Sequence, residues 1–390
     1  MTIIKQICQR ALKPNYNEDF YSSVAGLDLS AEAREIYEFE NTGFLDCKTS
    51  KEGYILASTT SGTLCVFESD CKFSFQKRVS CLGIRTVDWV NNINELFVCG
   101  TSQGDVVLGS VETESVISTY EVVPNESQIR CVSAKDDLIA WSSLDGLFGV
   151  LDRRCNKNCF IIKRAHQIKN VRSCTVSSIV FTPNQSFQEN LLITGGSTDG
   201  TIKIWDFRNC SNSNLAEIPR LRKDILRGQG IVSLSLDFQG KCLLSGRRGG
   251  DIVLHGLSSS VISSENFRFD QRSYFISSGN EILNAPNATV RLCATNNIVG
   301  LSGYGGCVAF SLNNPADALR LDVDGNECMS GCDFLPDGSF VSVSEQGYIR
   351  KWESQRRGLK KRKVFQELTI LETTQELLRK GSAYSMDLFH

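Results

Sequence analysis

Seven short segments of this chain share one pattern, in which an apolar strand, a turn that contains glycine and a second strand follow one another. The turn glycines are Gly62, Gly104, Gly146, Gly200, Gly250, Gly306 and Gly347, so the units repeat every 41 to 56 residues. A propeller blade of four strands needs about 40–45 residues, and loop insertions lengthen some blades. The repeat therefore predicts an all-β fold of seven blades, closed into a ring that leaves no open end.

The predicted propeller occupies residues 34–354. Within it, each unit follows an apolar segment that fits an inner strand, and outer strands fall between the units. Residues 34–40, REIYEFE, are expected to supply the outer strand that closes the last blade. Residues 1–33 are expected to be a short helical segment, which Pro14 ends, and residues 355–390 a basic, helical tail.

The composition argues against several classes of protein. The 390 residues have a formal net charge of −2, so no overall basic field favours nucleic acid. No apolar run reaches the ~18 residues of a membrane span, and the N-terminus lacks a signal-peptide core, so we expect an intracellular chain without a membrane partner. The sixteen cysteines are scattered, and neither Cys155/Cys159 nor Cys328/Cys332 has zinc spacing. We expect reduced, mostly buried thiols, and neither a metal nor a cofactor.

No catalytic motif stands out in the sequence. The segments GGSTDG and GRRGGD are rich in glycine, but they lie in strand-to-strand turns and lack the spacing of phosphate-binding loops. Neither a GxSxG nor an HExxH motif is present. The carboxylates are expected in turns and at solvent-facing positions. We therefore expect that the protein is not an enzyme.

The fourth unit contains the most regular stretch of the chain, LLITGGSTDGTIKIWDFRN, which spans residues 191–209. These units resemble WD repeats, and the fourth is the fullest match. The resemblance implies a buried, hydrogen-bonded tetrad, formed here by His166, Thr194, Asp199 and Trp205. The role of these four residues is then structural, and His166 is not a catalytic base.

Two neighbouring units end in the same short motif. Asp206 is followed two residues later by Arg208, and Asp152 is followed in the same way by Arg154. Both arginines are expected at one rim of adjacent blades, where the chain leaves the sheet. The other five units lack this motif, which favours a docking surface over two unrelated strand ends.

Paired Trp-Asp-x-Arg ends on neighbouring blades resemble the substrate receptors of the cullin-4 ubiquitin ligase, although Leu151 replaces Trp in the first copy. The resemblance implies docking on the ligase adaptor, damaged-DNA-binding protein 1, and through it on cullin-4. The segments LDRRCNKNCF and IKIWDFRN are similar to the denticleless-type receptors of that family, which act on replication and cell-cycle proteins. Only a short tail follows the repeats, and it contains no box for binding the replication clamp.

The N-terminal segment TIIKQICQRALKP gives a second element of the same resemblance. Its apolar residues are spaced four apart and form one face of a helix. A single helix of this length is marginal in water, so this face is expected to pack on the propeller itself or in a groove of another protein. The resemblance implies the adaptor's groove, with contacts from Ile3, Ile4, Ile7, Arg10 and Leu12.

Two basic regions remain. The segment RRGLKKRKV resembles a nuclear localisation signal, and its basic residues are Arg356, Arg357, Lys360, Lys361, Arg362 and Lys363. A solvated charge run and a contact with DNA are the alternatives. A patch on the fourth and fifth blades that binds an acidic degron or DNA phosphates, or is only surface, would contain Arg220, Arg222, Lys223, Arg227, Arg247 and Arg248.

The sequence thus favours a non-catalytic substrate receptor of a cullin-4 RING ubiquitin ligase. It would act in the nucleus, with the cytoplasm as a second compartment, and present replication, cell-cycle or DNA-repair proteins for ubiquitination. Two alternatives stay open, which are a WD-repeat scaffold of another nuclear complex in chromatin or RNA processing, and a receptor of the same ligase that binds DNA lesions. The substrate, its degron and the oligomeric state do not follow from the sequence.

Overall fold

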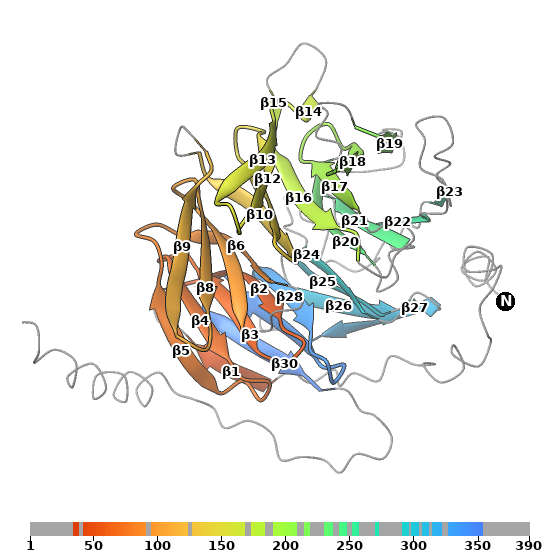
Figure 1. Ribbon diagram of the computed structural model, residues 1–390. Coiled ribbons are helices and arrows are strands. Elements are labelled where there is room, and N and C mark those ends of the chain that lie inside the picture. The colour runs from red at the N-terminus through yellow and green to blue at the C-terminus, as the bar shows by residue number, and fades with distance from the viewer. Residues whose placement is uncertain are drawn as a thin grey trace, which may run out of the picture.

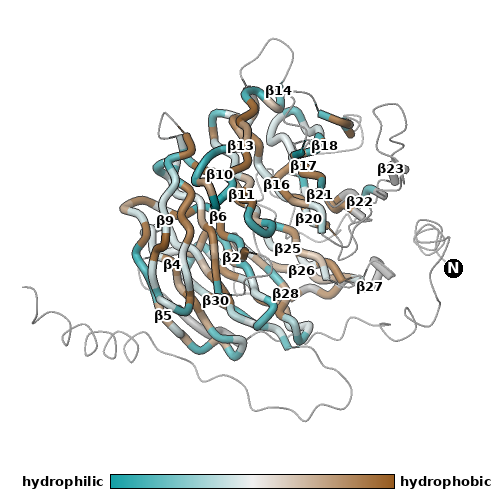
Figure 2. Tube along the Cα trace, in the orientation of Figure 1, coloured by the Kyte–Doolittle hydropathy of each residue, from teal (hydrophilic) through white to brown (hydrophobic). Residues whose placement is uncertain are grey.

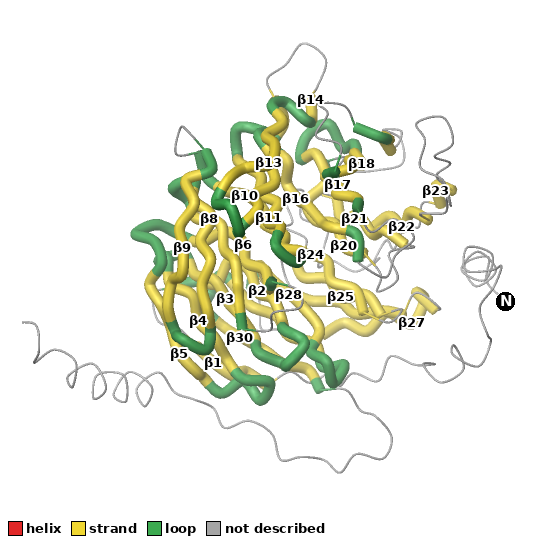
Figure 3. Tube along the Cα trace, viewed as in Figure 1, coloured by secondary structure: helices red, strands yellow, loops and turns green. Residues whose placement is uncertain are grey.

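The computed structural model describes residues 34–38, 42–90, 95–123, 127–167, 173–183, 190–208, 214–218, 230–236, 242–247, 252–256, 270–272, 291–295, 298–303, 306–311, 314–321 and 327–353. All regular elements in these ranges are strands, joined by loops and turns (Figure 3). No helix that could span a membrane occurs among them. The expected N-terminal helical segment and the expected C-terminal tail both lie outside the described residues.

The described strands form seven four-stranded antiparallel sheets, which we number as blades 1 to 7 along the chain (Figure 1). Blade 1 consists of β2 (Phe44–Thr49), β3 (Ile55–Thr59), β4 (Thr63–Phe67) and β5 (Phe73–Arg78). Blade 2 consists of β6 (Ile84–Trp89), β7 (Leu96–Thr101), β8 (Asp105–Ser110) and β9 (Ser115–Glu121). Blade 3 consists of β10 (Ile129–Lys135), β11 (Leu138–Ser143), β12 (Phe148–Asp152) and β13 (Lys157–Ile162).

Blade 4 consists of β16 (Val176–Phe181), β17 (Leu191–Gly196), β18 (Ile202–Asp206) and β19 (Ala216–Ile218), and a two-stranded hairpin, β14 (His166–Gln167) and β15 (Ser173–Cys174), precedes it. Blade 5 consists of β20 (Ile231–Leu236), β21 (Cys242–Arg247), β22 (Ile252–Gly256) and β23 (Asp270–Arg272). Blade 6 consists of β24 (Arg291–Thr295), β25 (Ile298–Gly303), β26 (Gly306–Ser311) and β27 (Asn314–Leu321). Blade 7 consists of β28 (Met329–Phe334), β29 (Phe340–Ser344), β30 (Tyr348–Trp352) and β1 (Arg34–Glu38).

The first strand of each blade is its inner strand, and the seven inner strands close a ring. Each of β2, β6, β10, β16, β20, β24 and β28 lies beside the next, and β28 lies beside β2. The strand β1 pairs antiparallel with β30, so that Arg34 lies opposite Lys351 and Glu38 opposite Tyr348. This pairing confirms that the segment at residue 34 closes the last blade, and the all-β propeller class is confirmed with it.

The turn between the second and third strands of a blade depends on glycine. Six of the seven turn glycines have a positive φ, which are Gly62 (84°), Gly104 (95°), Gly146 (87°), Gly200 (67°), Gly306 (144°) and Gly347 (95°). Gly250 lies outside the described residues. Since a side chain makes this backbone conformation costly, the glycines on which the repeat was aligned are the residues that the turns require.

The apolar core lies mainly between neighbouring blades. One cluster joins Phe44 of blade 1 to Val341 of blade 7, and another joins Val98 of blade 2 to Trp141 of blade 3. Figure 2 shows hydrophobic residues along the strands and hydrophilic residues in many of the connecting loops. Since the apolar faces of adjacent sheets cover one another, a blade is stable only with its neighbours in place.

Hydrogen bonds also link successive inner strands, and the sequence did not reveal them. On five inner strands, the side chain that follows a β-bulge accepts from a backbone N–H of the next inner strand. The pairs are Asp46 with Val87 (3.4 Å), Thr86 with Val132 (3.2 Å), Cys131 with Ile179 (3.4 Å), Ser178 with Leu234 (3.0 Å) and Ser233 with Leu292 (3.1 Å). These bonds satisfy backbone donors that face no strand of their own sheet.

Charged side chains on the inner strands correct one expectation. Asp88 and Asp333 accept backbone hydrogen bonds from neighbouring inner strands at 2.9 Å, on either side of the strand that carries Lys48. Burial raises the pKa of Asp88 to about 6, although Lys48 opposes the shift. Burial alone would lower the pKa of Lys48, but the carboxylates of Asp333 and Asp88 outweigh it and raise that pKa. The expectation that carboxylates occupy only turns and solvent-facing positions is therefore wrong.

Candidate functional site

Blade 4 contains a chain of hydrogen bonds through its interior. The indole Nε1 of Trp205 donates to the Thr194 hydroxyl at 2.9 Å, and that hydroxyl lies 2.9 Å from Nε2 of His166. Nδ1 of the same imidazole lies 2.9 Å from Oδ2 of Asp199. Because a carboxylate only accepts, Nδ1 carries the proton and Nε2 accepts from Thr194. All four side chains are buried, so every polar group of the tetrad is used inside the blade.

The tetrad explains why residue 196 is a glycine and why the pKa of Asp199 is low. A Cβ on Gly196 would lie 2.6 Å from Nδ1 of His166 and would also overlap the Asp199 carboxylate, so a side chain at this position would displace the pair. Burial alone would raise the pKa of Asp199, but hydrogen bonds from His166 and Thr201 outweigh it and hold that pKa below its usual value. The ionised carboxylate therefore stabilises the folded blade.

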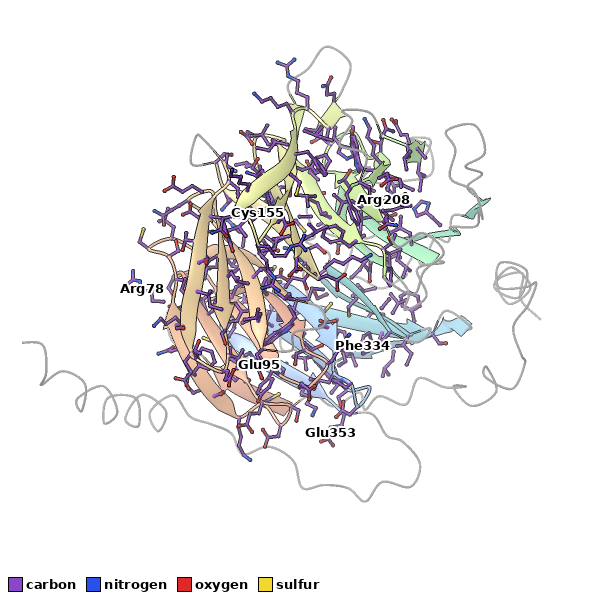
Figure 4. The ribbon with its side chains drawn as sticks, viewed as in Figure 1. Arg78, Glu95, Cys155, Arg208, Phe334 and Glu353 are labelled. Atoms are coloured by element: carbon purple, nitrogen blue, oxygen red, sulfur yellow. The ribbon has the colours of Figure 1, made fainter. Side chains whose placement is uncertain are left out.

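The end of β18 holds the arginine that follows Trp-Asp. Oδ1 of Asp206 accepts from the backbone N–H of Arg208 and from its Nε, both at 3.0 Å. Oδ2 of the same carboxylate accepts from Nη2 at 2.8 Å. One aspartate thus fixes both the turn and the direction of the guanidinium. The side chain of Arg208 is 64% exposed. Arg208 is labelled in Figure 4.

The end of β12 in blade 3 repeats this geometry. Asp152 accepts from the backbone N–H and Nε of Arg154, both at 3.0 Å, and from Nη2 at 2.6 Å. The arginine side chain is 67% exposed, and its hydrogen bond is the main reason that the pKa of Asp152 is lowered. Since β10 and β16 lie side by side, the two arginines belong to adjacent blades, and the antiparallel strand order places them on the same face.

Blade 3 adds a second carboxylate to its rim. Asp137, in the turn after β10, accepts from Nη2 of Arg153 at 2.6 Å and lies 3.5 Å from Nε of Arg154. The backbone N–H of Arg153 donates to the Asp137 carbonyl at 3.0 Å. In blade 4 the matching backbone bond joins Phe207 to Asn190, so neither an acid nor a second arginine occurs at these two positions. This additional pair does not follow from the repeat pattern of the sequence.

The interior of blade 3 contains no tetrad of the blade 4 type. Trp141 on β11 is fully buried, and its Nε1 donates to Oδ1 of Asn158 at 2.8 Å. It lies opposite Gly149, whose Cβ, if present, would approach the indole within 2.8 Å. The ring thus comes from the second strand, and Leu151 occupies the strand position that Trp205 has in blade 4. This exchange accounts for the missing Trp in the first rim motif.

The basic surface patch expected on blades 4 and 5 loses one of its members. Arg247 is 1% exposed, so it cannot belong to the basic surface patch expected on blades 4 and 5. The sequence pattern placed it at a turn, but it is the last residue of β21 and fills the interior. The remaining members of that patch, the N-terminal contacts and the basic tail lie outside the described residues.

The cysteines mostly behave as small apolar residues. Cys65, Cys99 and Cys293 are buried, and burial raises the pKa of the Cys99 thiol to about 12, whereas Cys131 is half-buried. Cys155 and Cys159 are exposed, and Cys155 is labelled beside the rim of blade 3 in Figure 4. Within the described ranges, no group of three or more His, Cys, Asp or Glu residues could hold a metal ion.

Comparison with known proteins identifies the family of the fourth repeat. A family model, the WD domain, G-beta repeat, matches residues 160–206, a range that contains the whole tetrad. A search of curated proteins finds no match to the chain. The tetrad, the matched repeat and the closed ring of sheets agree, and the chain is an all-β WD-repeat propeller.

Proposed function

We propose that this chain is a non-catalytic substrate receptor of a cullin-4 RING E3 ubiquitin ligase, which docks on the adaptor, damaged-DNA-binding protein 1. A WD-repeat propeller is a scaffold for protein interactions, and the resemblance of its rim motifs supports this particular scaffold role. The observation that carries the proposal is the repeated Asp-x-Arg geometry on blades 3 and 4.

The geometry suits a docking face for a physical reason. A free arginine side chain loses conformational entropy when a partner immobilises it. Here Asp152 and Asp206 already hold Nε and Nη2, so Arg154 and Arg208 are oriented before a partner arrives. Arginines that are exposed and held in place are typical anchors of protein interfaces. Two of them on adjacent blades would contact the adaptor together.

The other parts of the proposed receptor rest on the resemblances of the sequence. The N-terminal segment with Ile3, Ile4, Ile7, Arg10 and Leu12 would enter a groove of the adaptor. The opposite face of the ring would present a nuclear protein substrate, and residues 356–363 would direct import into the nucleus. The ligase's other subunits would carry out the ubiquitin chemistry.

The test is affinity capture of the full chain from nuclear extract, followed by mass spectrometry, with wild type and Arg154→Ala/Arg208→Ala compared. The matched control is Arg78→Ala, because Arg78 is also exposed but lies at the other end of its blade, where β5 pairs with the start of β4. We expect the adaptor and cullin-4 with wild type and with the control, and neither with the double variant.

Two outcomes would overturn the proposal. Capture of the adaptor by the double variant at the wild-type level would show that the rim is not the docking face. Absence of the adaptor from the wild-type sample would exclude the ligase, and the dominant partner would then name another nuclear complex that this scaffold serves.

A further inference from the structure

Strand pairing identifies which rim positions are equivalent between blades. The first residue of the second strand pairs with the last residue of the third strand, which gives Leu96 with Ser110, Leu138 with Asp152 and Leu191 with Asp206. The rim arginines lie two residues beyond these ends, at Arg154 and Arg208. The equivalent residue in blade 2 is Glu112, which is exposed. Blade 2 therefore has the opposite charge at the position of the arginines.

The four other blades have no charge at this position. The same pairing ends their third strands at Phe67, Gly256, Ser311 and Trp352, and the residues two positions further in the sequence are Ser69, Ser258, Asn313 and Ser354. Charges at the equivalent position thus occur on three consecutive blades, in the order negative, positive, positive. The inner strands β6, β10 and β16 of these blades lie side by side in that order.

Blade 2 also differs from blade 3 in what faces this position. The backbone N–H of Val111 donates to the Glu95 carbonyl at 2.8 Å, as Arg153 donates to Asp137 in blade 3. A carboxyl–carboxyl hydrogen bond with Glu112 raises the pKa of Glu95. Asp137 has Arg153 as its partner, whereas the described residues provide no basic partner for Glu95 or Glu112. Figure 4 labels Glu95 of blade 2 and Arg208 of blade 4.

We infer that the three blades form one docking surface of fixed polarity, which takes a partner with a basic side chain opposite Glu95 and Glu112 and acidic groups opposite Arg154 and Arg208. This inference rests on the proposed function, so the partner is the adaptor. A basic group between the two carboxyls relieves their mutual repulsion. The order of charges then fixes the direction in which the partner lies on the rim, because the reversed direction places like charges together.

The inference is tested by titrating the purified full chain with purified adaptor. Glu95→Gln/Glu112→Gln keeps the shape of the pair and removes its charge, and we expect the affinity to fall by roughly fivefold. Glu112→Arg reverses the charge, and we expect a loss of roughly tenfold or more. The control is Glu114→Gln, which removes an exposed carboxylate from the same turn outside the pair and should leave the affinity unchanged.

A pH series gives an independent readout. Since Glu95 is protonated more readily than an ordinary glutamate, wild-type affinity should fall as the pH is lowered from 7.5 to 5. The Gln/Gln variant should lose most of this dependence. Circular dichroism of each variant checks that the fold is retained.

The outcomes separate this inference from the proposed function. If Arg154→Ala/Arg208→Ala abolishes binding while the Gln/Gln and Glu112→Arg variants bind as wild type does, the docking face stands and the polarity is wrong. If the arginine variants bind normally, the docking face itself is wrong. If wild type does not bind the adaptor, both proposals fail together.

Discussion

Blades 3 and 4 lie next to each other and end in the same Asp-x-Arg geometry, but their interiors are built differently. In blade 4 the hydroxyl of Thr194 links His166 to Trp205 through hydrogen bonds. The register-equivalent residue of blade 3 is Trp141, which packs over Gly149. The hydrogen-bond distances at the two rims nevertheless agree within 0.2 Å.

This difference shows that the rim motif depends on where the third strand ends and not on how the blade is filled. The aspartate caps its own turn through the backbone N–H two residues later, which is a local interaction. A blade can therefore lack the residues of the WD tetrad and keep the Asp-x-Arg geometry at its rim.

The largest effect is expected at the buried indole of blade 3. Trp141→Ala leaves a cavity between blades 2 and 3, and we expect it to lower the free energy of unfolding by about 3–5 kcal/mol. Urea denaturation measures this change. The exposed Leu82 provides the reference, since Leu82→Ala should change it by less than about 0.5 kcal/mol.

Substitutions at Gly149 and Gly196 should show that the packing inside blade 3 and the packing inside blade 4 affect stability independently. Gly149→Ala presses on Trp141 and Gly196→Ala on the His166–Asp199 pair, and each should cost about 1–3 kcal/mol. In a Trp141→Phe background the loss of stability caused by Gly149→Ala should shrink, because the smaller ring makes room, although the Phe160 carbonyl, also 2.8 Å from the added Cβ, keeps part of it. The loss caused by Gly196→Ala should stay unchanged. A double-mutant cycle with equal coupling at both glycines would contradict the separation.

The pH dependence of stability should distinguish the blades. Because the folded pKa of Asp199 lies below its ordinary value of 3.8, its ionised form stabilises the fold above that pH, and this contribution disappears as the pH falls below it. Asp199→Asn should therefore cost about 1–2 kcal/mol at pH 7, and the difference from wild type should narrow towards pH 3. The cost of Asn158→Ala, which removes the partner of Trp141, should stay constant over the same range.

The smallest effect on stability is expected at the rim. Arg154→Ala and Arg208→Ala remove exposed ion pairs, so each should change the free energy of unfolding by less than about 0.5 kcal/mol. Thermal denaturation checks this expectation. A large loss at either position would mean that the arginine is needed for folding, and a binding defect could then not be assigned to docking.

The sequence predicted those parts of this account that depend on local pattern. The turn glycines such as Gly62 and the closing strand at Arg34 follow from spacing and residue type, and the tetrad around His166 follows from the resemblance to WD repeats. The sequence did not predict that the buried tryptophan of blade 3 is Trp141 on the second strand, where blade 4 has Trp205 on the third. It also did not predict that Arg247 is buried or that Glu112 lies close to Glu95. Each of these depends on the register between strands, which period and composition do not determine.

The most direct test of the central claim is the affinity of the purified chain for the purified adaptor, measured by calorimetric titration for wild type, Arg154→Ala and Arg208→Ala. If two differently built blades present equivalent anchors, each single variant should weaken binding by a similar factor, on the order of tenfold. Loss with Arg208→Ala alone would contradict the account, because only the blade with the tetrad would then dock. Unchanged affinity for both variants would remove the rim from the interface.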